Sequence, residues 1–206
     1  MATTRQRQKA ETARRIFEAA LRLFHEQGFA ATTVEQITKA AGVAKGTFFV
    51  HFASKEAVLE HIGRLQMDRL YAAFRNNPEF EAQPTRARLH AVVAALARGI
   101  EGQPAEMRTL AVELLARQSL LAIDRQGIGE LDALFEQIIA AGQTRGELLA
   151  DEPPSRLALL VRNAYFSAFF EWVQGEGLPL GALAARYLDL VLDGIAAPEN
   201  SKGGPS

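Results

Sequence analysis

Residues 33–52 read TVEQITKAAGVAKGTFFVHF, and this stretch decides the fold of the N-terminal part of the chain. Either Thr32 or Thr33 can cap a short helix at its start, because an acid or amide follows three residues later, as a capping box requires. Gly42 allows a sharp bend after that helix, and a second short helix then runs to near Phe52. Two short helices joined by a tight turn predict a helix-turn-helix.

The remaining sequence also has a helical pattern. Apolar residues recur at intervals of three and four, and no stretch alternates between apolar and polar residues. We therefore predict an all-α fold of about nine helices, with a small N-terminal domain of three helices and a larger C-terminal helical domain. The domains are expected at residues 1–54, with the motif at about 33–52, and at residues 55–196, before a disordered tail over 197–206. The helices are expected at about 7–27, 34–41, 43–52, 55–75, 85–100, 106–122, 129–145, 154–174 and 180–195.

Composition restricts the classes of protein that this chain can belong to. The chain has 206 residues, 48% of them hydrophobic, and no cysteine, which excludes a disulfide framework and thiolate metal sites. Because no apolar run approaches the roughly 20 residues of a membrane span, we expect a cytoplasmic protein without a membrane partner. We expect no metal site, no cofactor and no enzymatic activity, since a glycine-rich phosphate loop, a His-Glu-x-x-His motif and a compact carboxylate and histidine cluster are all missing from the sequence.

The charge is distributed unevenly along the chain. Residues 1–55 contain nine Lys and Arg against four Glu, a net charge of +5, whereas residues 56–206 contain fourteen against twenty acids, a net charge of −6. A basic N-terminal part is typical of a domain that contacts a polyanion. The second helix of a helix-turn-helix enters the major groove of double-stranded DNA, so Lys45, Gly46 and Thr47 are expected at phosphates and base edges.

Three motifs near the N-terminus have a specific spacing. They are Gly28-Phe29, Thr32-Thr33-Val34 and AAGVAKGTFFVHFASKE over residues 40–56. Together they closely resemble the DNA-binding domain of the tetracycline-repressor (TetR) family of bacterial transcription regulators, over roughly residues 9–60. The resemblance implies a homodimeric repressor that binds palindromic operator DNA and releases it when a small-molecule effector binds.

The resemblance also implies which side chains touch the operator. One position departs from the family pattern, because residue 49 is commonly a tyrosine whose hydroxyl reaches a phosphate. Phe49 has no hydroxyl, so its ring is expected to contact a thymine methyl group or a sugar instead. Gly46 is expected to let the backbone approach the DNA closely. The other expected contacts are Thr33, Lys45, Thr47, Phe49, His51 and Lys55.

The larger domain is expected to pair with a second copy and to hold the effector, because TetR-like proteins dimerise through their last two long helices. The helix after Pro154 has two apolar stripes, one for its own domain and one for a partner. The candidate dimer residues are Tyr165, Phe169, Trp172, Leu183, Tyr187 and Leu190. The candidate effector-binding residues, taken from the apolar middle helices, are Met67, Tyr71, Phe74, His90, Met107, Leu110 and Phe166.

Two alternative functions are open at this point. A protein of the same fold can bind DNA and a protein partner without a small-molecule effector, which predicts a filled interior in the larger domain and many genomic sites. A small helical enzyme with an accidental helix-turn-helix would need the reaction site that the sequence lacks.

Overall fold

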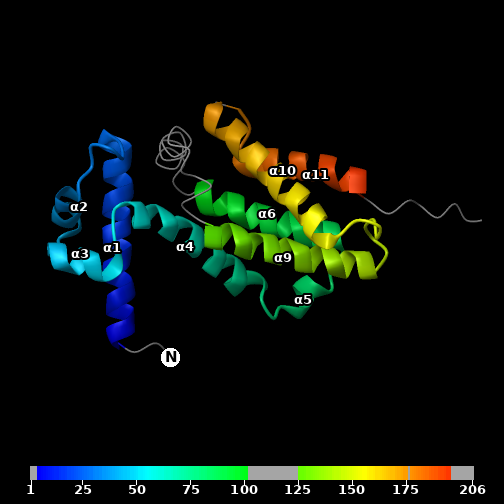
Figure 1. The fold of residues 1–206 in the computed structure, drawn as a ribbon, viewed down its shortest axis with the longest axis horizontal. Helices are drawn as coiled ribbons and strands as arrows, with labels where there is room; N and C mark the ends of the chain where they lie inside the picture. The colour runs from blue at the N-terminus through cyan, green and yellow to red at the C-terminus, as the bar shows by residue number, and fades with distance from the viewer. Residues whose placement is uncertain (1–3, 102–124, 176, 196–206) are drawn as a thin grey trace, which may run out of the picture. The chain divides into compact units, whose positions relative to one another are not determined.

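The computed structural model describes residues 4–101, 125–175 and 177–195, and every regular element in these ranges is an α-helix (Figure 1). The all-α prediction is confirmed. The helix expected at 106–122 and the tail at 197–206 lie outside these ranges. None of the described helices combines the length and apolar character that crossing a membrane needs. The helices are α1 (Thr4–Gln27), α2 (Val34–Ala41), α3 (Lys45–His51), α4 (Glu56–Phe74), α5 (Pro78–Glu81), α6 (Thr85–Glu101), α9 (Arg125–Thr144), α10 (Pro154–Gln174) and α11 (Leu180–Ile195).

The described chain divides into two compact units, and the boundary falls inside α4 after Leu65. The first unit therefore extends past the domain limit at residue 54 that the sequence suggested. The physical reason is the packing of the first part of α4. Val58 is fully buried in the core of the first unit, and the His61 ring lies edge-on to Phe17 and Phe52, with centroid distances of 5.3 and 5.4 Å.

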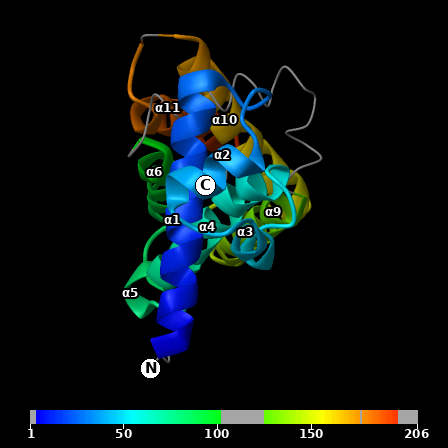
Figure 2. The ribbon, with the colours of Figure 1, turned by 90° about the vertical axis from the view of Figure 1, so that its left-hand side faces the viewer.

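The first unit is built around the apolar face of α1. Phe24 on α1 is fully buried, and its ring lies 4.8 Å from that of Phe29, which follows the helix. Gly28 ends α1 with a φ of 84°, a conformation that glycine adopts without strain. Helix α2 packs against α1, and α3 follows α2 beside it (Figure 2). Phe48 of α3 closes the core with no exposed surface.

The second unit is a layered group of helices in which α11 packs against both α10 and α6 (Figure 1). Helices α6 and α9 meet where Thr85 begins α6, because Gly142 of α9 leaves room for the Thr85 side chain. Leu149, in the loop after α9, donates its backbone N–H to the carbonyl of Ile195 over 3.1 Å. The end of the last helix is thus tied to the middle of the chain.

The short helix α5 is a feature that the sequence pattern does not predict, since Asn76-Asn77-Pro78 indicates a break. The residues that mark this break also begin α5. The Asn77 side chain accepts a hydrogen bond from the Phe80 backbone N–H over 3.1 Å, and Pro78 occupies the first turn of the new helix. As a result Phe80 is buried, with its ring 4.5 Å from that of Phe74.

Candidate functional site

The start of α2 is fixed by a capping box at Thr33. The Thr33 hydroxyl accepts from the Gln36 backbone N–H over 3.2 Å, and the Gln36 side chain accepts from the Thr33 backbone N–H over 2.7 Å. Thr32 has a different role, since it is buried and its hydroxyl donates to the Gly28 carbonyl over 2.8 Å. Of the two threonines that the sequence left open, Thr33 is the cap and its side chain stays exposed.

The turn between α2 and α3 has the bend that the sequence predicts. Gly42 adopts a φ of 64°, and the Val43 N–H donates back to the Thr38 carbonyl over 3.0 Å, which closes the end of α2. The Arg15 guanidinium donates to the Ala41 carbonyl over 2.6 Å and so ties α1 to the same turn. These contacts hold the direction in which α3 leaves α2.

Helix α3 presents a mixed polar and apolar surface. Lys45 and Gly46 are exposed at its start, and Phe49 and Val50 are exposed by 49% and 69%, unusually for large apolar side chains. Thr47, which lies between Gly46 and Phe48 in the sequence, is half-buried. Exposed apolar groups beside a lysine suit a surface that meets both base edges and phosphates.

Helix α3 carries two ionisable side chains, Lys45 and His51. Lys45 forms an exposed ion pair with Glu35 of α2, and its hydrogen bond lowers the pKa of that carboxyl. His51 is half-buried, and burial, with a smaller effect of the positive charge of Lys9, lowers the pKa of its imidazole. The lowered pKa favours the neutral imidazole, which can donate or accept a hydrogen bond.

Lys55 occupies an internal position rather than an open one. Its ammonium group donates to the backbone carbonyls of Phe29, Thr32 and Ala30 over 2.7, 2.9 and 3.3 Å. The same group lies 4.5 Å from the centre of the Phe29 ring. The ammonium thus closes the loop between α1 and α2, and the DNA contact that the resemblance implies for Lys55 stays a prediction.

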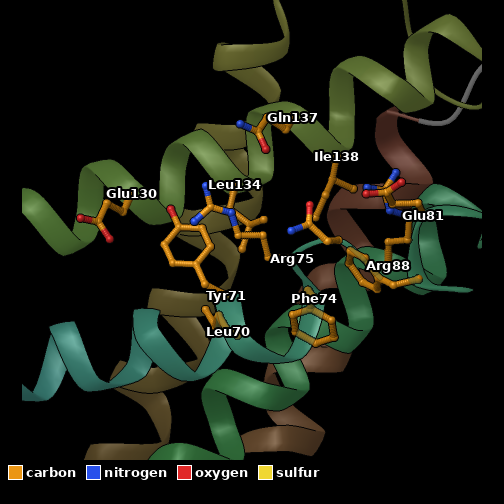
Figure 3. A pocket seen from close by; sticks show the side chains of 12 residues that line it. Leu70, Tyr71, Phe74, Arg75, Glu81, Arg88, Glu130, Leu134, Gln137 and Ile138 are labelled. Carbon is orange, nitrogen blue, oxygen red and sulfur yellow. The ribbon is translucent and has the colours of Figure 1, made fainter. Parts of the chain in front are cut away.

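A cavity of about 570 Å³ lies in the second unit (Figure 3). Figure 3 shows Tyr71 of α4 facing Leu134 and Gln137 of α9 across it. Of the effector-binding residues predicted from the sequence, Tyr71 and Phe74 line this cavity. Four ionisable residues that the sequence reasoning did not select also line it: Arg75, Glu81, Arg88 and Glu130.

The other candidate effector residues lie elsewhere. Met67 is buried in the core, and the His90 ring is hydrogen-bonded to Asp189 of α11 over 2.9 Å. Phe166 of α10 is half-buried, with its ring 6.3 Å from that of Phe170. Met107 and Leu110 fall outside the described residues. The sequence pattern marks all of these side chains as apolar or aromatic and carries no signal for which of them border an empty space.

The candidate dimer residues divide into buried and accessible side chains. Tyr165, Trp172 and Leu183 are each at most 5% exposed within the chain itself. Phe169 and Tyr187 are half-buried, and the Tyr187 hydroxyl donates to Glu171 over 2.6 Å. Large apolar side chains that do reach the surface of α10 and α11 are Leu159, Leu160 and Leu190.

Comparison with known proteins identifies relatives of the whole chain. Residues 16–62 match the family model described as bacterial regulatory proteins, tetR family. The transcriptional repressor KstR2 of Rhodococcus jostii is 29% identical over 192 residues, which make up 90% of this chain and 91% of that protein. The transcriptional regulator TcmR of Streptomyces glaucescens is 36% identical over 190 residues, or 89% of this chain and 82% of that protein.

A solved structure extends the similarity to three dimensions. It is that of Thermus thermophilus FadR, a TetR family transcriptional repressor, in complex with lauroyl-CoA. The sequences are 28% identical, the TM-score is 0.69, and the match covers 94% of this chain and 100% of that one. The similarity therefore includes both units of the described chain.

Proposed function

The chain belongs to the tetR family of bacterial regulatory proteins, and we propose that it is a repressor that binds a palindromic operator as a homodimer and releases it when a small molecule binds. The observation that carries the proposal is the surface of α3, where Lys45, Phe49 and Val50 are exposed on a helix that the Thr33 cap and the Gly42 turn hold in place. Such a helix can enter the major groove. The site of action is the cytoplasm, where the operator is.

The proposed homodimer is supported by the exposed apolar side chains of the last two helices, and it matches the symmetry of the proposed operator. A palindromic site is read by a protein with two-fold symmetry. Leu159 and Leu160 on α10 are 41% and 43% exposed, and Leu190 on α11 is 69% exposed. Exposed large apolar side chains on two helices that pack against each other favour burial against a second copy.

Release by a ligand is supported by the path of α4. The end of α4 contributes Leu70, Tyr71 and Phe74 to the cavity, whereas its beginning contributes Val58 to the core of the first unit. A ligand that favours one position of this helix shifts the population toward dimers with that position. Recognition helices that no longer lie about 34–36 Å apart, one turn of DNA, release the operator.

The two alternatives have less support. A protein partner without a small-molecule effector predicts a filled interior, whereas the second unit holds a cavity of about 570 Å³. The Thermus thermophilus FadR structure is a complex with a small molecule, lauroyl-CoA. The relatives reported above are transcription regulators rather than enzymes.

The test is selection of genomic fragments with the purified protein, followed by footprinting at two salt concentrations. A double variant, Lys45→Ala with Thr47→Ala, removes the polar groups at the start of α3. An Arg98→Ala variant removes an exposed cation of α6 and is the control. We expect a palindromic footprint that weakens steeply with salt, persists in the control and disappears in the double variant. Equal, sequence-independent retention of fragments by all three proteins would contradict the proposal.

A further inference from the structure

The wall of the cavity contains a largely buried cation, Arg88, whose Nε atom has no hydrogen-bond partner in the part of the chain that the structure describes. Arg88 of α6 is only 8% exposed, and its Nε atom is buried with no hydrogen-bond acceptor among the residues that the structure describes. Its closest aromatic neighbour is Phe80, whose ring centre lies 5.0 Å from the guanidinium carbon. Burying a charge costs free energy unless an opposite charge or hydrogen-bond acceptors compensate for it.

The carboxylates near Arg88 do not supply that compensation. Glu147 accepts from the Thr85 backbone N–H over 2.6 Å and from the Arg145 Nε over 2.5 Å, so both of its oxygens are engaged. Arg145 also places a second positive charge near Arg88, and Glu81 is an exposed carboxylate in contact with water. Burial, reinforced by Arg145, lowers the pKa of Arg88 despite the opposing effect of the two carboxylates.

The remaining wall of the cavity is amphipathic. Figure 3 shows Tyr71, Arg75 and Leu134 around one part of it and Phe74, Ile138 and Arg88 around another. Two arginines and two glutamates line the cavity, so their formal charges balance. The burial of Arg88 favours an anion beside it, because the exposed Glu81 keeps its hydration while Arg88 has lost most of its own.

We propose that this cavity binds a small carboxylic acid with an apolar or aromatic body, and that the carboxylate pairs with Arg88. The body of the ligand packs against Tyr71, Phe74 and Leu134. A volume of about 570 Å³ lies in the range of small-molecule sites. Arg88 lines the cavity, so the accessible part of its guanidinium can pair with the carboxylate in the two-point geometry that arginine and carboxylate share. The inference deepens the proposed function by naming the class of effector, and it rests on that function only where release of DNA is concerned.

The binding test uses a matched pair of fluorescent probes, pyrenebutyric acid and pyrenebutanol, titrated into the full-length protein at pH 7. The two share the apolar body and differ in the carboxylate. We expect the acid to bind at least about tenfold more tightly than the alcohol, as for a charge-assisted hydrogen-bonded pair. Arg88→Met should remove this preference, Arg88→Lys should retain part of it, and the control Arg98→Met should bind as the wild type does.

A second measurement separates a binding role for Arg88 from a structural one. Replacing an unpaired buried charge by an apolar side chain of similar length is neutral or stabilising, so the melting temperature of Arg88→Met should equal or exceed that of the wild type. A drop of several degrees would show that Arg88 stabilises the fold through a partner and would overturn the proposal. So would equal affinity for acid and alcohol, a preference that survives Arg88→Met, or failure of both probes to bind.

The outcome is independent of the DNA experiment. If pyrenebutyric acid binds in an Arg88-dependent manner but does not weaken operator binding, the ligand class is supported and ligand-induced release is contradicted. A palindromic footprint combined with no preference for the acid would leave the proposed repressor function in place and reject the ligand class.

Discussion

At the scale of single residues, three basic side chains show how surroundings decide a role. Lys45 has one exposed carboxylate partner, a type of pair that contributes little to stability, so a DNA phosphate can replace Glu35 at small cost. Lys55 donates to three backbone carbonyls and thereby stabilises a loop. Arg88 is largely buried, has no acceptor for its Nε atom in the described chain and lines the cavity, where a ligand carboxylate is its proposed partner. In the sequence all three are simply basic residues, and their different roles are not distinguishable there.

The contacts of Lys55 predict a loss of stability when the ammonium is removed. Lys55→Met keeps the aliphatic part beside Phe29 but leaves the carbonyls of Phe29, Thr32 and Ala30 without their charged donor. We expect the free energy of unfolding to fall by about 1.5–3 kcal/mol, measured by urea denaturation. Lys39→Met, at an exposed position of α2, is the control and should change it by less than about 0.5 kcal/mol. Unchanged stability with a shallower salt dependence of DNA binding would instead assign Lys55 to the operator.

The missing hydroxyl at Phe49 predicts a gain of affinity. Phe49 is 49% exposed, so Phe49→Tyr adds a hydroxyl at the surface without disturbing the core. We expect operator binding to tighten by about fivefold, the effect of one added hydrogen bond of roughly 1 kcal/mol, in a titration at fixed salt. Phe48→Tyr adds the same group at a fully buried position and should lower the melting temperature instead. Equal affinity of Phe49→Tyr and wild type would show that no phosphate lies within reach.

At the scale of elements, the sequence predicts helix boundaries well where residues next to the boundary cap or interrupt the helix. The ends of α2, α10 and α11 agree with the sequence pattern to the residue, because a threonine cap, prolines and glycines mark them. Helix α5 escapes prediction because Asn77 and Pro78 can end one helix and begin another with the same residues. The burial of Phe80, a tertiary contact that accompanies the new helix, is not visible in the local sequence.

The contact between α6 and α9 predicts opposite effects of two glycine substitutions in one helix. A Cβ atom at Gly142 would lie 2.9 Å from the Thr85 Cγ2 atom and even closer to its hydroxyl, whereas a Cβ atom at Gly129 meets nothing within 4 Å. We expect Gly142→Ala to destabilise the protein by about 1–3 kcal/mol and Gly129→Ala to stabilise it by up to about 1 kcal/mol. Thermal unfolding measures both, and Thr85→Ala in combination should reduce the Gly142→Ala penalty. A stabilising Gly142→Ala would show that the two helices separate freely.

The carboxylate of Glu147 predicts how stability depends on pH at this junction. Its hydrogen bond with Arg145, aided by those from Thr85, lowers the pKa of Glu147 from 4.5 to about 2. A carboxyl whose pKa is lower in the folded state stabilises that state above the unfolded pKa, and the contribution disappears as the pH falls through the folded pKa. Glu147→Gln should therefore be less stable than the wild type at pH 7, by on the order of 1–2 kcal/mol after solvent screening.

Urea denaturation between pH 7 and pH 2 measures that difference. The wild-type advantage over Glu147→Gln should be complete above about pH 5 and should be mostly lost at about pH 2, where roughly half of the folded molecules have a protonated Glu147. Glu79→Gln removes an exposed carboxylate of α5 and should show no such convergence. An advantage that is constant down to pH 2 would mean that the charge of Glu147 does not stabilise the junction.

At the scale of the whole molecule, the sequence predicts that the last two helices have more apolar surface than their own domain buries. It does not identify which face of each helix stays exposed. Helix α10 has two apolar stripes, and the sequence pattern favours the one with Tyr165, Phe169 and Trp172 as the dimer face. Tyr165 and Trp172 are buried within the chain itself, in a unit where α11 contacts both α10 and α6. Leu160 and Leu190 remain exposed. We therefore expect a second copy to meet the chain at these exposed leucines, of which the sequence pattern singles out only Leu190.

The exposed leucines predict that one charge can separate the dimer without unfolding the protein. Leu190→Arg on α11 and Leu160→Arg on α10 each place a cation on the proposed face, where a partner would have to bury it. We expect monomers in sedimentation equilibrium and an operator affinity lower by roughly 100-fold, because each half-site is then bound independently. Circular dichroism should be unchanged, since both positions are exposed. Ala133→Arg adds the same charge at an exposed site of α9 and should remain dimeric. If both leucine variants sediment as dimers and bind the operator as the wild type does, the second copy docks on another surface, and the apolar face of α10 and α11 needs a different partner.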